Sequence, residues 1–188
     1  MRLLNLTVSL FAQKGSKSGM SDHQHIFQPA TILRVNAIGA PGERTFFLQG
    51  GDAVKLVSLL IEKVQVQVLA AGAIRLINQI EAELFDFEKS LAKYDEAEMQ
   101  LVMPVDPLFK VDEVALGYDQ EKDLFLLQVA EEGPEEKRQQ VLFWVTREKM
   151  HGLALWALEL ASRGRPEPPL HEKPSGNGFR HGNNGHKS

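Results

Sequence analysis

The sequence contains no cysteine among its 188 residues. Disulfide bonds, thiolate zinc sites and cysteine nucleophiles are therefore excluded together, and the composition fits a reducing compartment, so we expect a cytoplasmic protein. Basic residues are not in excess, because 21 Lys and Arg stand against 25 Asp and Glu and give a formal net charge of -4. Without an overall basic field, neither nucleic acid nor an anionic membrane surface is an expected partner.

Long apolar runs are also lacking near the N-terminus. The apolar stretch there is interrupted by Asn5, Thr7 and Ser9, and it is shorter than the roughly 20 residues that span a bilayer. It lacks most features of a secretory signal. We interpret residues 1–21 as a disordered N-terminal extension, with Met20 as a candidate alternative start.

The remaining chain contains enough apolar residues, 43% of the total, for one core. Short apolar runs bounded by turn residues begin near His25, and Pro41 and Gly42 mark a turn between two predicted strands. A helix is then predicted from Glu62 to about Leu84. Its apolar stripe repeats at intervals of four residues: Val64, Val68, Gly72, Leu76, Ile80 and Leu84.

Three further strands and a second helix complete the pattern. The strand from Phe109 to Tyr118 changes the phase of its apolar residues near Glu113, which predicts a β-bulge. Thr146 is a suitable N-cap for a helix that runs to about Arg163. Blocks of strands and helices in this order predict one α+β domain, residues 22–164, in which two main helices pack on one face of an antiparallel β-sheet.

Four quoted segments together resemble a known family: "HIFQPATILRVNAIGAPGERTFFLQ", "LIEKVQVQVLA", "FKVDEVALGYDQEKDLFLLQ" and "TREKMHGLALWALELASRGRPEPPL". In this order they are similar to a bacterial family of domains of unknown function, of actinobacterial and Chloroflexi type, over about residues 25–186. The most specific pieces are the Pro-Gly-x-Arg-x-Phe turn at residues 41–46 and the Arg-Gly-Arg-Pro sequence that ends the last helix. The resemblance implies a fold and carries no established activity.

The resemblance also implies a Cys-rich, zinc-ribbon-like tail, whose cysteines are missing here. Residues 165–188 are rich in Pro, Gly, Asn and His, and we expect a disordered tail. A structural zinc site has four ligands at short fixed spacings, whereas His171, His181 and His186 lie ten and five residues apart. We therefore expect no metal and no other cofactor, and these three histidines are the alternative ligand set.

Candidate ligand-binding residues lie around the predicted turn at Gly39–Phe46, whose backbone could form a concave anion-binding site. They are Arg34, Gly42, Arg44 and Glu62. The alternative is an ordinary hairpin turn, because Pro-Gly beside an exposed Arg is common in such turns. The chain has neither the Gly-Lys-Ser/Thr of a P-loop nor a Gly-x-Gly-x-x-Gly motif at this place.

Two functions remain open, and no recognisable catalytic triad favours an enzyme. The preferred one is a non-enzymatic protein-interaction or regulatory module, favoured by the acidic segment Glu81–Glu98 and the extended tail. The alternative is a binder of, or an enzyme acting on, a small anionic, phosphorylated ligand at the Gly39–Phe46 turn. A pocket lined by Arg34, Arg44 and Glu62 would favour the alternative.

The tail leads to a first testable prediction. The purified chain should contain no stoichiometric zinc, and a chelator should leave its melting temperature unchanged, because structural zinc contributes roughly 10 kcal/mol or more to a fold that depends on it. Elemental analysis and thermal melts measure both. One zinc per chain, lost in both His171→Ala and His181→Ala, would instead make the histidines ligands.

Overall fold

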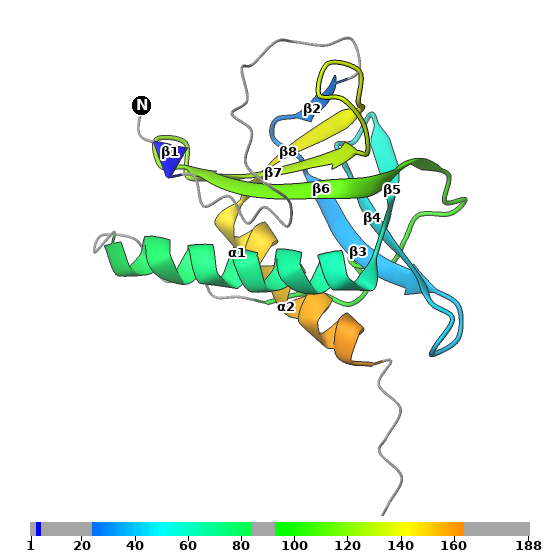
Figure 1. The fold of residues 1–188 in the computed structure, drawn as a ribbon. Helices are drawn as coiled ribbons and strands as arrows, with labels where there is room; N and C mark the ends of the chain where they lie inside the picture. The colour runs from blue at the N-terminus through cyan, green and yellow to red at the C-terminus, as the bar shows by residue number, and fades with distance from the viewer. Residues whose placement is uncertain (1–2, 5–23, 84–92, 164–188) are drawn as a thin grey trace, which may run out of the picture.

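The computed structural model describes residues 3–4, 24–83 and 93–163, and it shows an α+β protein, as predicted (Figure 1). The elements follow the chain in this order: β1 (Leu3–Leu4), β2 (Gln24–Phe27), β3 (Ile32–Ile38), β4 (Thr45–Gly51), β5 (Leu56–Ile61), α1 (Lys63–Glu83), β6 (Pro107–Asp119), β7 (Leu124–Glu131), β8 (Gln140–Thr146) and α2 (Arg147–Ser162).

The division into a domain and two extensions stays a prediction, because most of both extensions lies outside the described residues. Within the predicted N-terminal extension, Leu3 and Leu4 form β1, which pairs with Tyr118 and Asp119 of β6. The tail, residues 165–188, lies wholly outside the description.

The sheet is mixed rather than antiparallel, which corrects one part of the prediction. Seven strands follow the order β2-β8-β7-β6-β5-β4-β3, and two neighbouring pairs, β2 with β8 and β5 with β6, are parallel. Parallel neighbours need a crossover connection, and α1 lies in the one between β5 and β6. The predicted bulge is confirmed, because the register of β6 against β7 shifts between Val111 and Glu113.

The sheet curves until its two edges approach each other. Residues 28–31 alone connect β2 to β3, the two edge strands of the order, and so short a linker spans at most about 18 Å. Inside the curve, the ring of Phe143 on β8 stacks on Phe27 at 5.6 Å between centroids. The same ring faces Gly50 on β4, where the missing side chain makes room for it.

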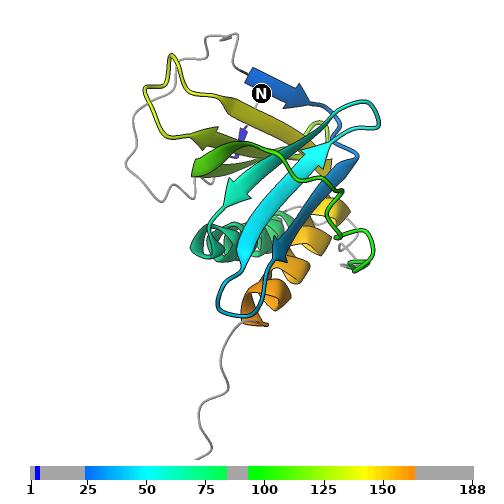
Figure 2. The same cartoon turned by 90° about the vertical axis from the view of Figure 1, so that its right-hand side faces the viewer.

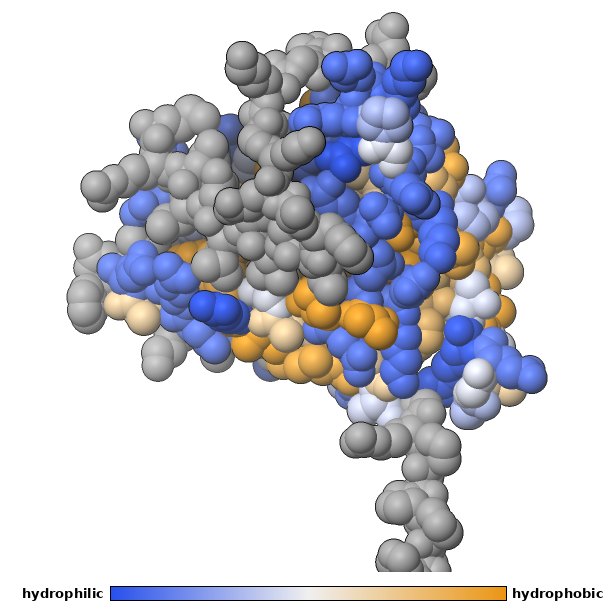
Figure 3. All heavy atoms as spheres, in the orientation of Figure 1, coloured by the Kyte–Doolittle hydropathy of each residue, from blue (hydrophilic) through white to orange (hydrophobic). Residues whose placement is uncertain are grey.

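Both helices lie on one side of the strands, as predicted, and they cross each other there (Figures 1 and 2). The buried face of α1 is the following set: Val66, Leu69, Ala70, Gly72, Ala73, Leu76, Ile77 and Ile80. Val64, which the predicted stripe included, is 58% exposed. The buried face begins two residues later, at Val66, because a strict interval of four residues drifts away from a face that repeats every 3.6 residues. In Figure 3, apolar residues show along part of the viewer-facing side of α1, and polar residues show around the part of β6 that is in view.

The second helix is held at its start and near its middle. The hydroxyl of Thr146 accepts a hydrogen bond from the backbone N–H of Lys149 at 3.3 Å, which confirms the predicted N-cap. Farther along, the indole Nε1–H of Trp156 donates to the carbonyl oxygen of Val35 at 2.7 Å. This bond joins α2 to the edge strand β3 in the buried interior, where Trp156 is 1% exposed.

Gly50→Ala tests the contact inside the curved sheet. A Cβ at this position would lie 2.5 Å from Cε1 and 2.9 Å from Cδ1 of Phe143. Overpacking of this kind costs about 1–3 kcal/mol of unfolding free energy, which exceeds the roughly 0.4–1 kcal/mol gained when Gly becomes Ala at an unstrained position. Urea unfolding should therefore show a net loss of stability.

Phe143→Leu supplies the matched partner variant. Because the smaller side chain leaves room for a Cβ, the double variant should lose less stability than the sum of the two single losses. Strictly additive losses would show that Gly50 and Phe143 do not constrain each other.

Candidate functional site

A cavity of about 470 Å³ lies where the β3–β4 hairpin meets the start of α1. We call it the Arg44 cavity. Its lining residues are Gly42, Arg44, Thr45, Phe46, Leu60, Ile61, Glu62, Lys63, Lys110 and Leu160. It therefore brings together the hairpin, the β5–α1 junction, the start of β6 and the end of α2.

The hairpin turn presents Arg44 to this cavity. The N–H of Glu43 donates to the carbonyl oxygen of Ala40 at 2.9 Å, and Gly42 has a φ of 96°. Proline at the second position and a positive φ at the third define a type II turn, which explains the Pro41-Gly42 pair. Because the turn uses the N–H of Glu43, the anion-attracting group here is the Arg44 side chain and not a backbone nest.

Arg44 has an unsatisfied donor. Its Nη1 atom is buried, and no described residue accepts a hydrogen bond from it. A buried donor of a permanently charged guanidinium costs free energy unless an acceptor or an ordered water reaches it. The position beside a cavity supplies the space for such an acceptor.

The start of α1 adds positive potential to the same place. The first turn of α1 contains no acidic residue and begins instead with Lys63. The N–H of Glu62 donates to Oε1 of Gln65 at 2.9 Å, but no described side chain accepts from the first N–H groups of the helix. A helix N-terminus with open N–H groups attracts anions, and a cation there opposes the helix dipole. The first turn of α1 is therefore less stable than it would be with an acidic residue in place of Lys63.

Glu62 is the one carboxylate among the lining residues, and it is already engaged. Its Oε1 lies 2.7 Å from Nζ of Lys110. The hydrogen bond with Glu62, and after it the negative charge of the same carboxylate, raises the pKa of Lys110. Lys110 is therefore a cation at neutral pH, and the lining residues carry three positive charges against one negative charge.

The structure brings three of the four predicted site residues together and separates the fourth. Gly42, Arg44 and Glu62 line the Arg44 cavity. Arg34 instead lines a second cavity, and its Nη1 donates to the carbonyl oxygen of Gln100 at 2.6 Å. Its side chain lies on β3, well before the hairpin that carries Arg44, so the two do not share a site.

Sequence reasoning did not assign Lys110 to the site. Lys110 is the register partner of Leu60 in the parallel β5–β6 pair, and Glu62 lies two residues beyond Leu60 on the same strand-to-helix path. Only this long-range parallel pairing places Lys110 beside Glu62. No local motif in the sequence carries that information.

The described residues contain no group of three or more His, Asp or Glu side chains that could hold a metal ion. His171, His181 and His186 lie outside the described residues. Neither α1 nor α2 is long and apolar enough to cross a membrane.

The fold and the cavity define an α+β protein with a cationic pocket at the start of a helix. The chain belongs to the family described as protein of unknown function DUF3090, whose model matches residues 25–181. The resemblance found in the sequence is therefore confirmed at the level of an uncharacterised family. Searches of curated proteins and of solved structures found no match.

Gln65 leads to a prediction about the wall of the cavity. Its Nε2 donates to the carbonyl oxygens of Val111 and Asp112 at 3.0 and 3.1 Å, while its Oε1 accepts from Glu62. Gln65→Ala removes these bonds, of which the one to Val111 is partly buried and the others are exposed to water. We therefore expect a loss of about 0.5–1.5 kcal/mol of unfolding free energy in urea.

Glu62→Gln is the control for that measurement. It removes only the charge of an ion pair whose side chains are 58% and 60% exposed, and such pairs contribute little to stability. Equal losses in the two variants would show that Gln65 does not anchor the helix start.

Proposed function

We propose that the protein binds a small anionic ligand, such as a phosphorylated metabolite, with its charged group in the Arg44 cavity. The observation that carries this proposal is the buried Nη1 of Arg44, which lacks a partner among the described residues. Lys63 and the open N-terminus of α1 add favourable interactions with negative charge. An anion with several acceptor oxygens satisfies these donors together.

The other walls of the cavity define the rest of the ligand. Phe46, Ile61 and Leu160 line it as buried apolar residues. Binding pockets that combine an apolar wall with a few charged groups bury the body of a ligand and orient its head. We therefore propose a ligand with an anionic head and an apolar body.

The cavity changes which of the two functions suggested by the sequence we prefer: ligand binding now ranks above a protein-interaction module. A pocket at Arg34, Arg44 and Glu62 was the feature expected to favour ligand binding, and two of these three residues share one. We propose binding rather than catalysis because the carboxylate of Glu62 is engaged with Lys110. A role as a protein-interaction module in the cytoplasm remains a prediction from the sequence.

Arg44→Ala tests the proposed function. Phenyl phosphate, which has an anionic head and an apolar ring, is the probe, and inorganic phosphate measures the contribution of the head alone. Loss of a charge-assisted hydrogen bond should raise the Kd for phenyl phosphate about 10- to 100-fold in isothermal titration calorimetry. Glu62→Gln should lower the Kd for both probes, because it removes the negative charge next to the anion.

Arg75→Ala is the matched control. Arg75 is an exposed arginine on α1, and it lies twelve residues beyond Lys63, roughly 18 Å along the helix axis. It changes the net charge equally but should leave both Kd values unchanged. If Arg44→Ala and Arg75→Ala weaken binding to the same extent, the effect reflects the overall charge and the proposal fails.

A further inference from the structure

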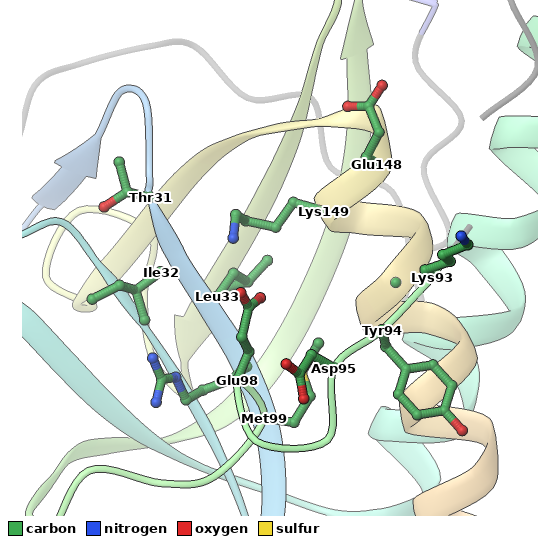
Figure 4. A pocket seen from close by; sticks show the side chains of 12 residues that line it. Thr31, Ile32, Leu33, Lys93, Tyr94, Asp95, Glu98, Met99, Glu148 and Lys149 are labelled. Atoms are coloured by element: carbon green, nitrogen blue, oxygen red, sulfur yellow. The ribbon is translucent and has the colours of Figure 1, made fainter. Parts of the chain in front are cut away.

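A second cavity, of about 270 Å³, borders the first half of β3 and shares no lining residue with the Arg44 cavity. Three parts of the chain enclose it (Figure 4): the start of β3, the segment 93–99, and the first two turns of α2. We call it the β3-edge cavity. Its lining residues are Thr31, Ile32, Leu33, Arg34, Lys93, Tyr94, Asp95, Glu98, Met99, Glu148, Lys149 and Gly152.

The free edge of β3 already has side-chain partners beyond this cavity. β3 ends the strand order, so one of its edges meets no other strand among the described residues. On that edge the carbonyl oxygen of Val35 accepts from the indole of Trp156 at 2.7 Å, and the N–H of Ala37 donates to Oδ1 of Asn36 at 2.8 Å. These contacts show that the backbone groups of Val35 and Ala37 point away from β4.

Leu33 is in phase with Val35 and Ala37. In a regular antiparallel pair the outward-pointing residues alternate, and the register of β3 against β4 is unbroken from Ile32 to Ile38. The N–H and C=O of Leu33 therefore also point away from β4, and no described residue provides them with a partner. Leu33 is only 3% exposed, and buried backbone polar groups almost always have a partner. The β3-edge cavity is where that partner fits.

Charges of opposite sign stand at the two sides of this backbone position. In Figure 4 the ammonium group of Lys149 points toward the start of β3 near Thr31, while the carboxylates of Glu98 and Asp95 lie on the other side of Leu33. Neither Lys149 nor Glu98 forms an ion pair with another described residue. Asp95 uses one oxygen to accept from the N–H of Ala97, which leaves the other oxygen available.

We propose that the β3-edge cavity binds a short peptide with free termini, in an extended conformation antiparallel to β3. One residue of the peptide exchanges two backbone hydrogen bonds with Leu33, as a residue of an added strand does. The carboxylate of the peptide lies near Lys149 and its ammonium group near Glu98 and Asp95. This direction follows from the charges, because β3 runs from the side of Lys149 toward the side of the carboxylates.

Two features set this ligand apart from the one in the Arg44 cavity. The lining charges of the β3-edge cavity balance, with three basic and three acidic residues, so the site has no preference for an anion. The backbone donor and acceptor on Leu33 match a peptide unit rather than a phosphate group. The inference therefore does not depend on the function proposed for the Arg44 cavity.

Tri-alanine with free termini is the probe, and NMR of the full-length, ¹⁵N-labelled chain is the measurement. We expect saturable shifts of the amide signals of Leu33, Lys149 and Gly152, and slower hydrogen exchange at the N–H of Leu33. Acetylating the amine or amidating the carboxylate should each raise the Kd about two- to fivefold, the range for an exposed ion pair. Methylating the central peptide nitrogen removes one donor and should raise it about two- to tenfold.

Charge variants identify the two sides of the site. Lys149→Ala should abolish the effect of amidation, and Glu98→Gln should reduce the effect of acetylation. The matched controls are Lys137→Ala and Glu135→Gln, two exposed positions in the β7–β8 connection, which should leave the Kd for tri-alanine unchanged.

Three outcomes would overturn the peptide site. The first is the absence of a saturable shift at Leu33, which would mean that water alone fills the cavity. The second is free alanine binding as tightly as tri-alanine, which would make the ligand a single amino acid. The third is equal binding of the free, acetylated and amidated peptides, which would remove the role of Lys149, Glu98 and Asp95.

Discussion

The contact between Phe143 and Gly50 is the constraint on which the rest of the structure depends. Phe143 belongs to β8 and Gly50 to β4, which lie four steps apart in the strand order. Their contact, with Phe27 stacked on the same ring, requires the sheet to curve strongly. A curved sheet has one inner side that must be filled, and α2 supplies the fully buried Trp156 and Met150 that help to fill it.

The electrostatics of the Arg44 cavity follow from one strand direction. A parallel β5–β6 pair places Lys110 beside the end of β5, where Glu62 and Lys63 begin α1. Glu62 then pairs with Lys110 instead of capping the helix. The start of α2 has the side-chain cap that helix N-termini favour, Thr146. In the part of the chain that the structure describes, the start of α1 has no such cap and begins with a lysine. Departures of this kind from local consistency are typical of functional sites.

The sequence predicted what depends on local patterns. The α+β class, both helices, the Pro41-Gly42 turn, the Thr146 cap and the bulge near Glu113 all follow from periodicity or from the preferences of single residues. The two parallel strand pairs could not be predicted in this way, because side-chain alternation along a strand is the same for parallel and antiparallel neighbours. The prediction of the site had the same limit.

Distance along the chain does not decide which of the four candidate residues line the Arg44 cavity. Gly42 and Arg44 lie on one turn. Glu62 directly follows β5, which pairs with β4, the strand after that turn. Arg34 was grouped with them because it precedes the turn, yet its bond to Gln100 depends on a segment 66 residues away. Hydrophobic patterns contain no information about where such a segment crosses the sheet.

The two cavities lie at opposite ends of the same pair of elements. The start of β3 and the first turns of α2 line the β3-edge cavity, whereas the hairpin after β3 and Leu160 near the end of α2 line the Arg44 cavity. Between them, the hydrogen bond from Trp156 to Val35 joins α2 to β3 in the buried interior. Because packed interiors deform little, we expect a displacement of α2 at one cavity to shift the wall of the other. The geometry of each site therefore depends on the same buried bond.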